Sequence, residues 1–349
     1  MHRKYLSLYF FVFLVSTLGT LFVNALVDPL WYFKGNRFSH RNFPFDERGS
    51  KTQLFLKTKD QNYDCILFGS SRVTLLRESL FEENNCFNYA FSAGSASEFL
   101  QYADYISDQG VTPNKVYIGI DGSNFKPGLT QTDQSVTTLP VYRAYLSFDV
   151  LLFSLRILSG RYEGPRYYNS ERNFESGVVT TLPDYQPKFR VRRSSVACDP
   201  SRIDIYRQIQ QEFPEAEVVG FVPPISAWHL VNNLYHYGDL MDCYFSVVHQ
   251  LAQEFETVYD FSIPSDITQN PANSYNGGHY YPETQEKVAY IIQGRSEEFG
   301  VDVSQYSETE YRRLYLSSVE QFLTAQERRD LIRDDFQAEA PAAIDLAAQ

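Results

Sequence analysis

Two short segments of this chain carry side chains that could do chemistry together. An apolar run, Cys65-Ile66-Leu67-Phe68, ends in Gly69-Ser70-Ser71-Arg72, and a histidine follows about two hundred residues later in Asn276-Gly277-Gly278-His279. A serine on a tight turn after a buried strand, joined by a distant histidine, is the arrangement that supports nucleophilic acyl chemistry. Gly-Ser-Ser by itself is a common loop sequence, so the prediction depends on the two segments meeting in the fold.

The pattern around these segments is that of an α/β domain, in which buried strands alternate with amphipathic helices. We expect strands at 64–68, within 79–91, at 115–120, 217–222 and 258–261, and helices at 97–109, 203–213, 240–255 and 284–299. The serine segment follows the first strand, and the histidine segment precedes the last helix. Three other histidines, His229, His236 and His249, are read as ordinary structural residues.

The N-terminus predicts a membrane anchor. The run from Tyr5 to Val27 has no charged residue and, as a helix, would span about 34 Å, enough for the roughly 30 Å apolar core of a bilayer. Arg3 and Lys4 precede it, which favours a cytoplasmic N-terminus and a body outside the cytoplasm. Val23-Asn24-Ala25 loosely resembles a signal-peptidase site, but the run exceeds an ordinary signal sequence, so we expect an uncleaved anchor at 1–28.

The remaining chain is expected to fall into three parts, the second of which carries an insertion. Residues 29–60 are a juxtamembrane connector rich in aromatic and basic side chains, and 61–300 are the α/β domain. Within that domain, 131–193 break the α/β pattern, with an apolar helix expected around 144–158, and are the candidate lid or substrate subdomain. Residues 301–349 are highly charged and predict a tail of surface helices.

Composition restricts the partners and metal sites. The 349 residues carry a net charge of −12, which argues against nucleic acid as a partner, because phosphate binding needs a basic surface. The four cysteines, Cys65, Cys86, Cys198 and Cys243, have no CxxC spacing, so neither zinc nor a redox motif is expected. Two alternatives remain open for them: disulfides, with Cys65–Cys86 as the favoured pair if their strands are neighbours, or four buried thiols.

The order of these parts resembles the SGNH (GDSL-type) hydrolase and acyltransferase superfamily, over roughly residues 63–294. It is most similar to the membrane-anchored extracytoplasmic branch, which includes proteins of alginate O-acetylation and lipoteichoic-acid D-alanylation. The resemblance implies a three-layer α/β/α fold with a flavodoxin-like parallel sheet, and no metal or cofactor. Gly69-Ser70-Ser71 stands where the family has Gly-Asp-Ser, which implies Ser71 as nucleophile and leaves Ser70 as the reserve candidate.

The resemblance also implies the other site residues. The segment Asn88–Gly94 is similar to the family's second block, so the backbone N–H groups of Gly94 and Ser71 would hold the oxyanion. The third block is less similar, and its amide donor would be Asn124. The family's D-x-x-H is here Asn276 to His279, which implies His279 as general base and Asn276 as the residue that orients it.

The asparagine at position 276 leaves three alternatives open. His279 could be oriented by Asn276 or by a backbone carbonyl, or another acid, Asp260 or Asp266, could reach the ring, or the site could be a degenerate binding pocket. An asparagine adds no negative charge beside the imidazolium, and the corresponding change in serine proteases costs about 10⁴ in rate.

Three more residues near the serine are substrate-binding candidates: Ser70, Arg72 and Asp121. Arg72 could hold an anionic substrate group or pair with a carboxylate, and we favour the pair.

The function implied by the resemblance is an esterase or O-acyltransferase that acts on acyl esters, such as acetyl, of an envelope or exported polysaccharide. It would be a single-pass protein of the inner membrane, held through residues 5–27, with its C-terminal domain in the periplasm or cell exterior. A multi-pass membrane acyltransferase is the expected partner. The alternative is a catalytically degenerate binding or scaffold protein in a polysaccharide assembly complex.

Overall fold

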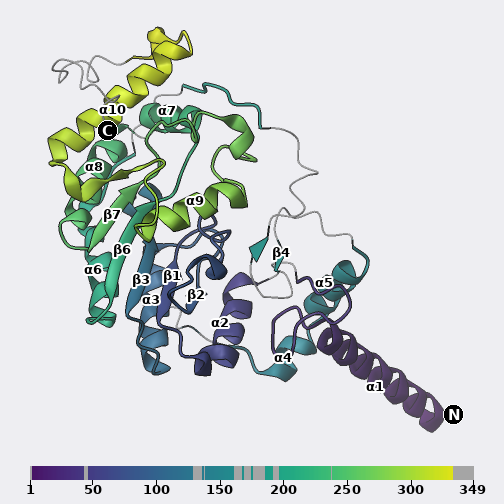
Figure 1. Ribbon diagram of the computed structural model, residues 1–349. Helices are drawn as coiled ribbons and strands as arrows, with labels where there is room; N and C mark the ends of the chain where they lie inside the picture. The colour runs from purple at the N-terminus through teal and green to yellow at the C-terminus, as the bar shows by residue number, and fades with distance from the viewer. Residues whose placement is uncertain are drawn as a thin grey trace. The chain divides into compact units, whose positions relative to one another are not determined.

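The chain divides into two compact units (Figure 1). The computed structural model describes residues 2–42, 46–128, 136, 138–160, 167–168, 174–175, 185–191, 196–236 and 238–332. The large unit comprises 64–132 and 183–349, and the small unit comprises 1–63 and 133–182. Part of the expected lid, 131–193, lies outside the described residues, namely 131–135, 137, 161–166, 169–173, 176–184 and 192–193. The boundaries differ from the expected ones, because part of this insertion groups with the N-terminal segment.

A mixed, mostly parallel sheet is the centre of the large unit. Its strands are β1 (Cys65–Phe68), β2 (Cys86–Asn88), β3 (Lys115–Gly119), β6 (Glu217–Val222), β7 (Thr257–Asp260) and β8 (Val301–Asp302). They lie in the order β2-β1-β3-β6-β7-β8; the first five are parallel, and β8 is antiparallel to β7. All four residues of β1 are buried, as expected for a parallel strand that is covered on both faces and reads as a continuous apolar run.

Helices cover both faces of this sheet (Figure 1). The longer ones are α3 (Ala96–Asp108), α6 (Ile203–Glu212), α7 (Ala227–His236), α8 (Gly238–Ala252), α9 (Pro282–Ile292) and α10 (Glu308–Ala325). On one face, Val288 and Ile292 of α9 belong to one apolar cluster with Leu67 of β1. On the other face, Phe99 of α3 stacks on Phe68. Short 3-10 turns lie at Lys59–Gln61, Glu78–Leu80, Gly122–Phe125, Pro200–Arg202, Pro271–Asn273, Val303–Gln305 and Arg329–Leu331.

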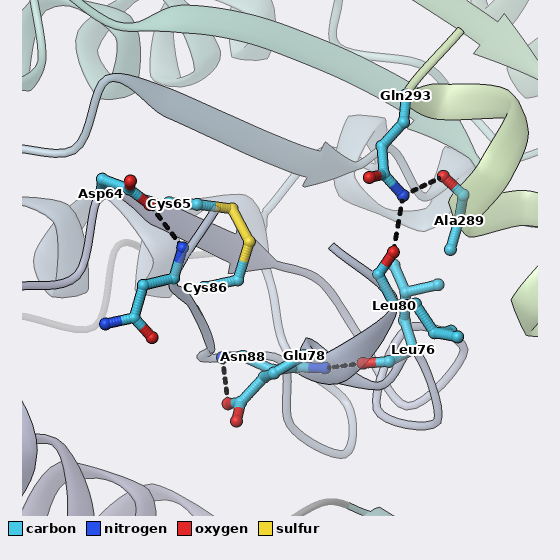
Figure 2. Close-up of a disulfide and its surroundings, with 10 residues drawn as sticks. Asp64, Cys65, Leu76, Glu78, Leu80, Cys86, Asn88, Ala289 and Gln293 are labelled. Atoms are coloured by element: carbon cyan, nitrogen blue, oxygen red, sulfur yellow. Dashed lines mark hydrogen bonds between the residues drawn. A yellow bond between two sulfur atoms is a disulfide. The ribbon is translucent and has the colours of Figure 1, made fainter. Parts of the chain in front are cut away.

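All four cysteines form disulfides. Cys65 is bonded to Cys86, and the two residues are register partners on neighbouring strands β1 and β2 (Figure 2). Cys198 is bonded to Cys243 of α8. The structure thus has the disulfides and not the four buried thiols, and the pairing favoured from the sequence is confirmed. The segment after β1 is tied to β2 nearby, because the side chain of Asn88 donates to the carbonyl oxygen of Leu76 at 2.8 Å.

The described part of the expected tail contains helix α10, and one face of this helix is packed. One side of α10 buries four large side chains, Tyr311, Tyr315, Val319 and Phe322. Their spacing of four, four and three residues places them on one helical face. Two of these rings, Tyr311 and Tyr315, contact Phe245 of α8. Helix α10 is therefore amphipathic, and its many charged residues make its apolar face difficult to recognise in the sequence.

The small unit contains α1 (His2–Val27), α2 (Glu47–Thr58), α4 (Val141–Tyr145), α5 (Phe148–Leu158) and the two-residue strands β4 (Tyr167–Tyr168) and β5 (Phe174–Glu175). Helix α1 is long and apolar enough to cross a membrane. The connector after it folds back around Asp28, whose carboxylate accepts hydrogen bonds from the backbone N–H groups of Phe33 at 2.9 Å and Gly35 at 2.6 Å. Burial raises the pKa of this carboxyl.

Candidate active site

The predicted serine and histidine meet in the structure. Ser71 Oγ lies 2.8 Å from His279 Nε2, although the two residues are 208 positions apart in the chain. Both side chains are partly exposed, so a substrate can reach them. The turn that holds Ser71 begins at Gly69, where a Cβ atom would lie 2.4 Å from the side chain of Val73. Only glycine fits there without displacing Val73.

The histidine loop lies between β7 and α9, and its own hydrogen bonds shape it. The carbonyl oxygen of His279 accepts bonds from the hydroxyl of Ser274 at 2.8 Å and the N–H of Tyr275 at 3.1 Å. The ring of Tyr275 stacks on the imidazole with the centroids 5.5 Å apart. Gln285 of α9 donates to the carbonyl oxygen of Arg72 at 3.1 Å, which connects this region to the nucleophile turn.

Asn276 is the residue that holds the imidazole. Its Oδ1 lies 3.0 Å from His279 Nδ1 and also accepts the backbone N–H groups of Gly278 at 3.1 Å and His279 at 2.9 Å. Two backbone donors identify this atom as the amide oxygen, so Nδ1 must carry the proton. Nε2 then presents its lone pair to Ser71, which is the tautomer that a general base needs.

Asp260, another acid considered from the sequence, is not in this position. Asp260 is fully buried and accepts hydrogen bonds from the hydroxyls of Tyr244 and Tyr311 and the N–H of Ser262. Burial raises the pKa of this carboxyl. Asp266 is exposed. The structure therefore brings Asn276, and not Asp260, to the ring.

Two of the expected oxyanion donors are already bonded within the protein. The N–H of Gly94 donates to the carbonyl oxygen of Phe91 at 3.0 Å. The side chain of Asn124 donates to the hydroxyl of Tyr206 at 3.0 Å and is itself buried. The structure does not present these two groups as ready oxyanion donors, which differs from the expectation. The third expected donor, the backbone N–H of Ser71, lies in the same turn as the Ser71 hydroxyl.

The three substrate-binding candidates have separate environments. Ser70 is buried, and its hydroxyl oxygen lies 3.4 Å from the N–H of Arg72. Arg72 forms an ion pair with Asp121, the alternative that we favoured, and also donates to the carbonyl oxygen of Pro223 at 3.4 Å. Asp121 Oδ2 is buried and has no hydrogen-bond partner among the described residues.

A cavity of about 300 Å³ opens beside this ion pair. It lies at the carboxyl ends of β3, β6 and β7, the edge where parallel α/β sheets bind ligands. Its walls combine aliphatic side chains such as Leu230 and Met241 with polar ones, among them Lys126 and Asn233. A space of this size and character is suited to a small ligand or part of a larger one.

One residue that sequence reasoning passed over packs against the site. His229 was taken as ordinary, but its Nδ1 is buried and has no hydrogen-bond partner among the described residues. A Cβ at Gly277 would lie 2.5 Å from this nitrogen, and the φ of Gly277 is +80°. Ser226 anchors the contact by donating its N–H to the carbonyl oxygen of Gly277 at 2.8 Å. Ser226 and His229 follow β6, and their place after the carboxyl end of a sheet strand is the feature of the sequence that could have identified His229.

The sequence matches no protein-family model, and a search of curated proteins finds no significant match. Among the described residues, no group of three or more His, Cys, Asp or Glu side chains could hold a metal ion.

Proposed function

We propose that this chain is a membrane-anchored, extracytoplasmic serine esterase or O-acyltransferase of SGNH type. The observation that carries the proposal is the hydrogen-bonded chain from Ser71 through His279 to Asn276, with distances of 2.8 and 3.0 Å. A hydroxyl, an imidazole and an orienting acceptor in this order are the parts that acyl transfer requires.

The reaction follows from these three residues. Ser71 Oγ attacks the acyl carbonyl while His279 Nε2 takes the hydroxyl proton, and the negative charge moves to the carbonyl oxygen. His279 then returns that proton to the departing alcohol, which leaves Ser71 acylated. In the second half, water or an acceptor hydroxyl attacks the acyl-serine and gives its proton to His279. The bond between the acyl carbon and Ser71 Oγ then breaks, His279 returns the proton to Ser71 Oγ, and the acid or the new ester is released.

The asparagine is compatible with this role because its oxygen is fixed. In serine proteases the Asp-to-Asn change is damaging largely because the imidazole takes the wrong tautomer. Here the N–H groups of Gly278 and His279 hold Asn276 Oδ1 toward the ring, so the amide NH₂ faces away from it. Asn276 can thus fix the productive tautomer, and only the missing negative charge remains as a cost.

The strand order supports the proposed assignment to this superfamily. Setting aside the antiparallel edge strand, the parallel strands follow the order second, first, third, fourth, fifth in sequence, which is that of flavodoxin-like sheets. Ser71 follows β1, and His279 follows β7, so both come from the carboxyl edge of the sheet. The envelope or exported polysaccharide as substrate, the acetyl group and the multi-pass membrane acyltransferase as partner are proposed from the sequence resemblance.

Two features support a place outside the cytoplasm. Disulfides persist in oxidising compartments, and both pairs of cysteines are bonded here. Arg3 and Lys4 precede the apolar helix α1, which favours a cytoplasmic N-terminus. Asn24 and Val27 at the end of α1 are buried within the small unit, so cleavage near Ala25 would remove part of a packed element. We therefore propose an uncleaved anchor of the inner membrane.

The test is covalent labelling of the full-length protein in detergent with a fluorophosphonate probe. We expect labelling of the wild type and of Ser70→Ala, and none of Ser71→Ala, since only Ser71 contacts His279 among these two serines. Hydrolysis of p-nitrophenyl acetate by the same three proteins gives a second measurement. Labelling that survives in Ser71→Ala would contradict the proposal.

A scaffold or binding protein is the second candidate, and one observation favours it. The Gly94 N–H is bonded to the carbonyl oxygen of Phe91, and the Asn124 amide is buried with one of its two N–H groups bonded to Tyr206, so neither donor is presented to a substrate. If neither the probe nor the ester reacts with folded wild-type protein, while an acylated polysaccharide binds it, this alternative is the better one.

A further inference from the structure

Helix α5 has two apolar faces, and the fold covers one of them. Val150, Phe153 and Ile157 form the inner face and are at most 7% exposed. The outer face of α5, defined here as Phe148, Leu152, Leu155 and Leu158, is 42 to 66% exposed. The spacing of four, three and three residues makes this second set a continuous stripe on the side opposite to the inner face.

The inner face fixes α5 to the last turns of α1 within the small unit. Val27 of α1 clusters with Phe153 and Ile157. The hydroxyl of Ser154 donates to Asn24 Oδ1 at 2.9 Å, and Asn24 donates in turn to the carbonyl oxygen of Tyr145 at 2.8 Å. Buried side-chain bonds of this kind define one relative position of the two helices.

The place of this contact along α1 corresponds to the boundary of a bilayer. A membrane core of about 30 Å takes about 20 helical residues, so a span that starts near Tyr5 ends near Asn24. Residues 3–16 of α1 are exposed, and full burial begins only at Asn24. Helix α5 is thus fixed to the segment of α1 that emerges from the lipid.

We propose that the outer face of α5 lies in the lipid at this boundary, so that the protein holds the membrane through an interfacial helix as well as through α1. The proposal rests on the proposed membrane anchor and is independent of the proposed enzymatic activity. Four large apolar side chains on one stripe, joined to the end of a spanning helix, fit the apolar zone beneath the lipid headgroups. Arg143 and Arg156 are exposed beside them and can reach lipid phosphates with their long side chains.

The experiment uses the full-length protein in vesicles of phosphatidylcholine and phosphatidylglycerol. Single cysteines are introduced by Leu152→Cys and Leu155→Cys on the outer face, by Arg156→Cys on the polar flank and by Val12→Cys in the middle of α1. The native cysteines are all paired, so an NBD maleimide reacts with the added thiol. Emission is then measured with spin-labelled phosphatidylcholine as the lipid quencher and with iodide as the aqueous quencher.

We expect a loss of emission with the lipid quencher at positions 152, 155 and 12, and a loss with iodide at position 156. Quenching of positions 152 and 155 by iodide alone would overturn the proposal, and so would protection from both quenchers, which would indicate a protein partner or a second copy of the chain. If position 12 is quenched by lipid and the two α5 positions are not, the anchor stands and the inference about α5 fails. Lack of lipid quenching at position 12 overturns both.

Discussion

Replacement of Asn276 by aspartate should speed the acyl-transfer step if this residue orients the catalytic imidazole. Oδ1 of Asn276 accepts from the backbone at Gly278 and His279 and from His279 Nδ1, and a carboxylate oxygen can accept all three bonds. The geometry of the loop therefore survives the change, and the difference is one negative charge beside the imidazolium that forms when Ser71 attacks.

The size of the effect follows from the position of that charge. Two unit charges about 4 Å apart interact by about 1 kcal/mol in water and about 4 kcal/mol at the effective dielectric of a protein surface. Asn276 is exposed, so the lower end applies. A gain of about 1–2 kcal/mol corresponds to a rate about 5 to 30 times higher. This is far below the factor of about 10⁴ known for a buried triad, where the wrong tautomer adds to the loss.

The assay is kcat/KM for p-nitrophenyl acetate, together with the rate of inactivation by the fluorophosphonate probe. Asn276→Leu is the matched variant, since it keeps the size of the side chain but removes the acceptor, and it should lower both rates. Asn276→Asp combined with Ser71→Ala must be inactive. An unchanged or lower rate in a folded Asn276→Asp protein would refute the orienting role of Asn276. A gain near 10⁴ would refute the argument that solvent weakens the interaction between this charge and the imidazolium.

The site and the core give three more predictions. Gly277→Ala should lower ester hydrolysis by about 10²-fold, because the added Cβ meets a side chain at 2.5 Å and the φ is +80°, whereas Gly278→Ala, whose Cβ has 3.8 Å of space, should retain activity. In Cys65→Ala/Cys86→Ala, the unfolded chain is no longer cross-linked between two residues that are 21 positions apart. The free energy of unfolding should therefore fall by about 3 kcal/mol in a denaturant titration, and an unchanged midpoint would contradict this expectation. Because burial raises the pKa of Asp260, the folded state binds that proton more tightly than the unfolded state, so the melting temperature should fall as pH rises from about 4. The pH dependence of the melting temperature should weaken in Asp260→Asn. The same pH dependence in wild type and variant would contradict the role given to Asp260.

The sequence was sufficient to predict the five parallel strands of the sheet and the meeting of the serine and histidine segments. Strands buried on both faces appear as short apolar runs, as in β1, and the same edge of a parallel sheet collects the loops that follow the strands. Ser71 and His279 follow different strands of this kind, so their proximity could be expected without knowing any side-chain contact.

The choice of partners for individual polar groups could not be predicted. Asn276, and not Asp260, reaches the imidazole because the core encloses the Asp260 carboxylate, which accepts hydrogen bonds from tyrosines of α8 and α10. That packing involves α10, whose high charge hid its apolar face in the sequence. The grouping of 133–182 with the N-terminal segment is likewise a long-range contact, and local patterns do not encode it.

The proposed role of Gly94 in the oxyanion hole requires its N–H to change its hydrogen-bond acceptor. Its N–H is bonded to the carbonyl oxygen of Phe91, and a substrate oxyanion would have to replace that acceptor. A bond between two neutral groups contributes about 0.5–1.5 kcal/mol net, and one to a charged group about 1.5–3 kcal/mol. The exchange is therefore unfavourable or neutral with a bound ester and favourable once charge develops on its oxygen. A donor released only in the transition state lowers the barrier without tightening substrate binding, so the occupied turn is compatible with catalysis and predicts weak binding of the ground-state ester.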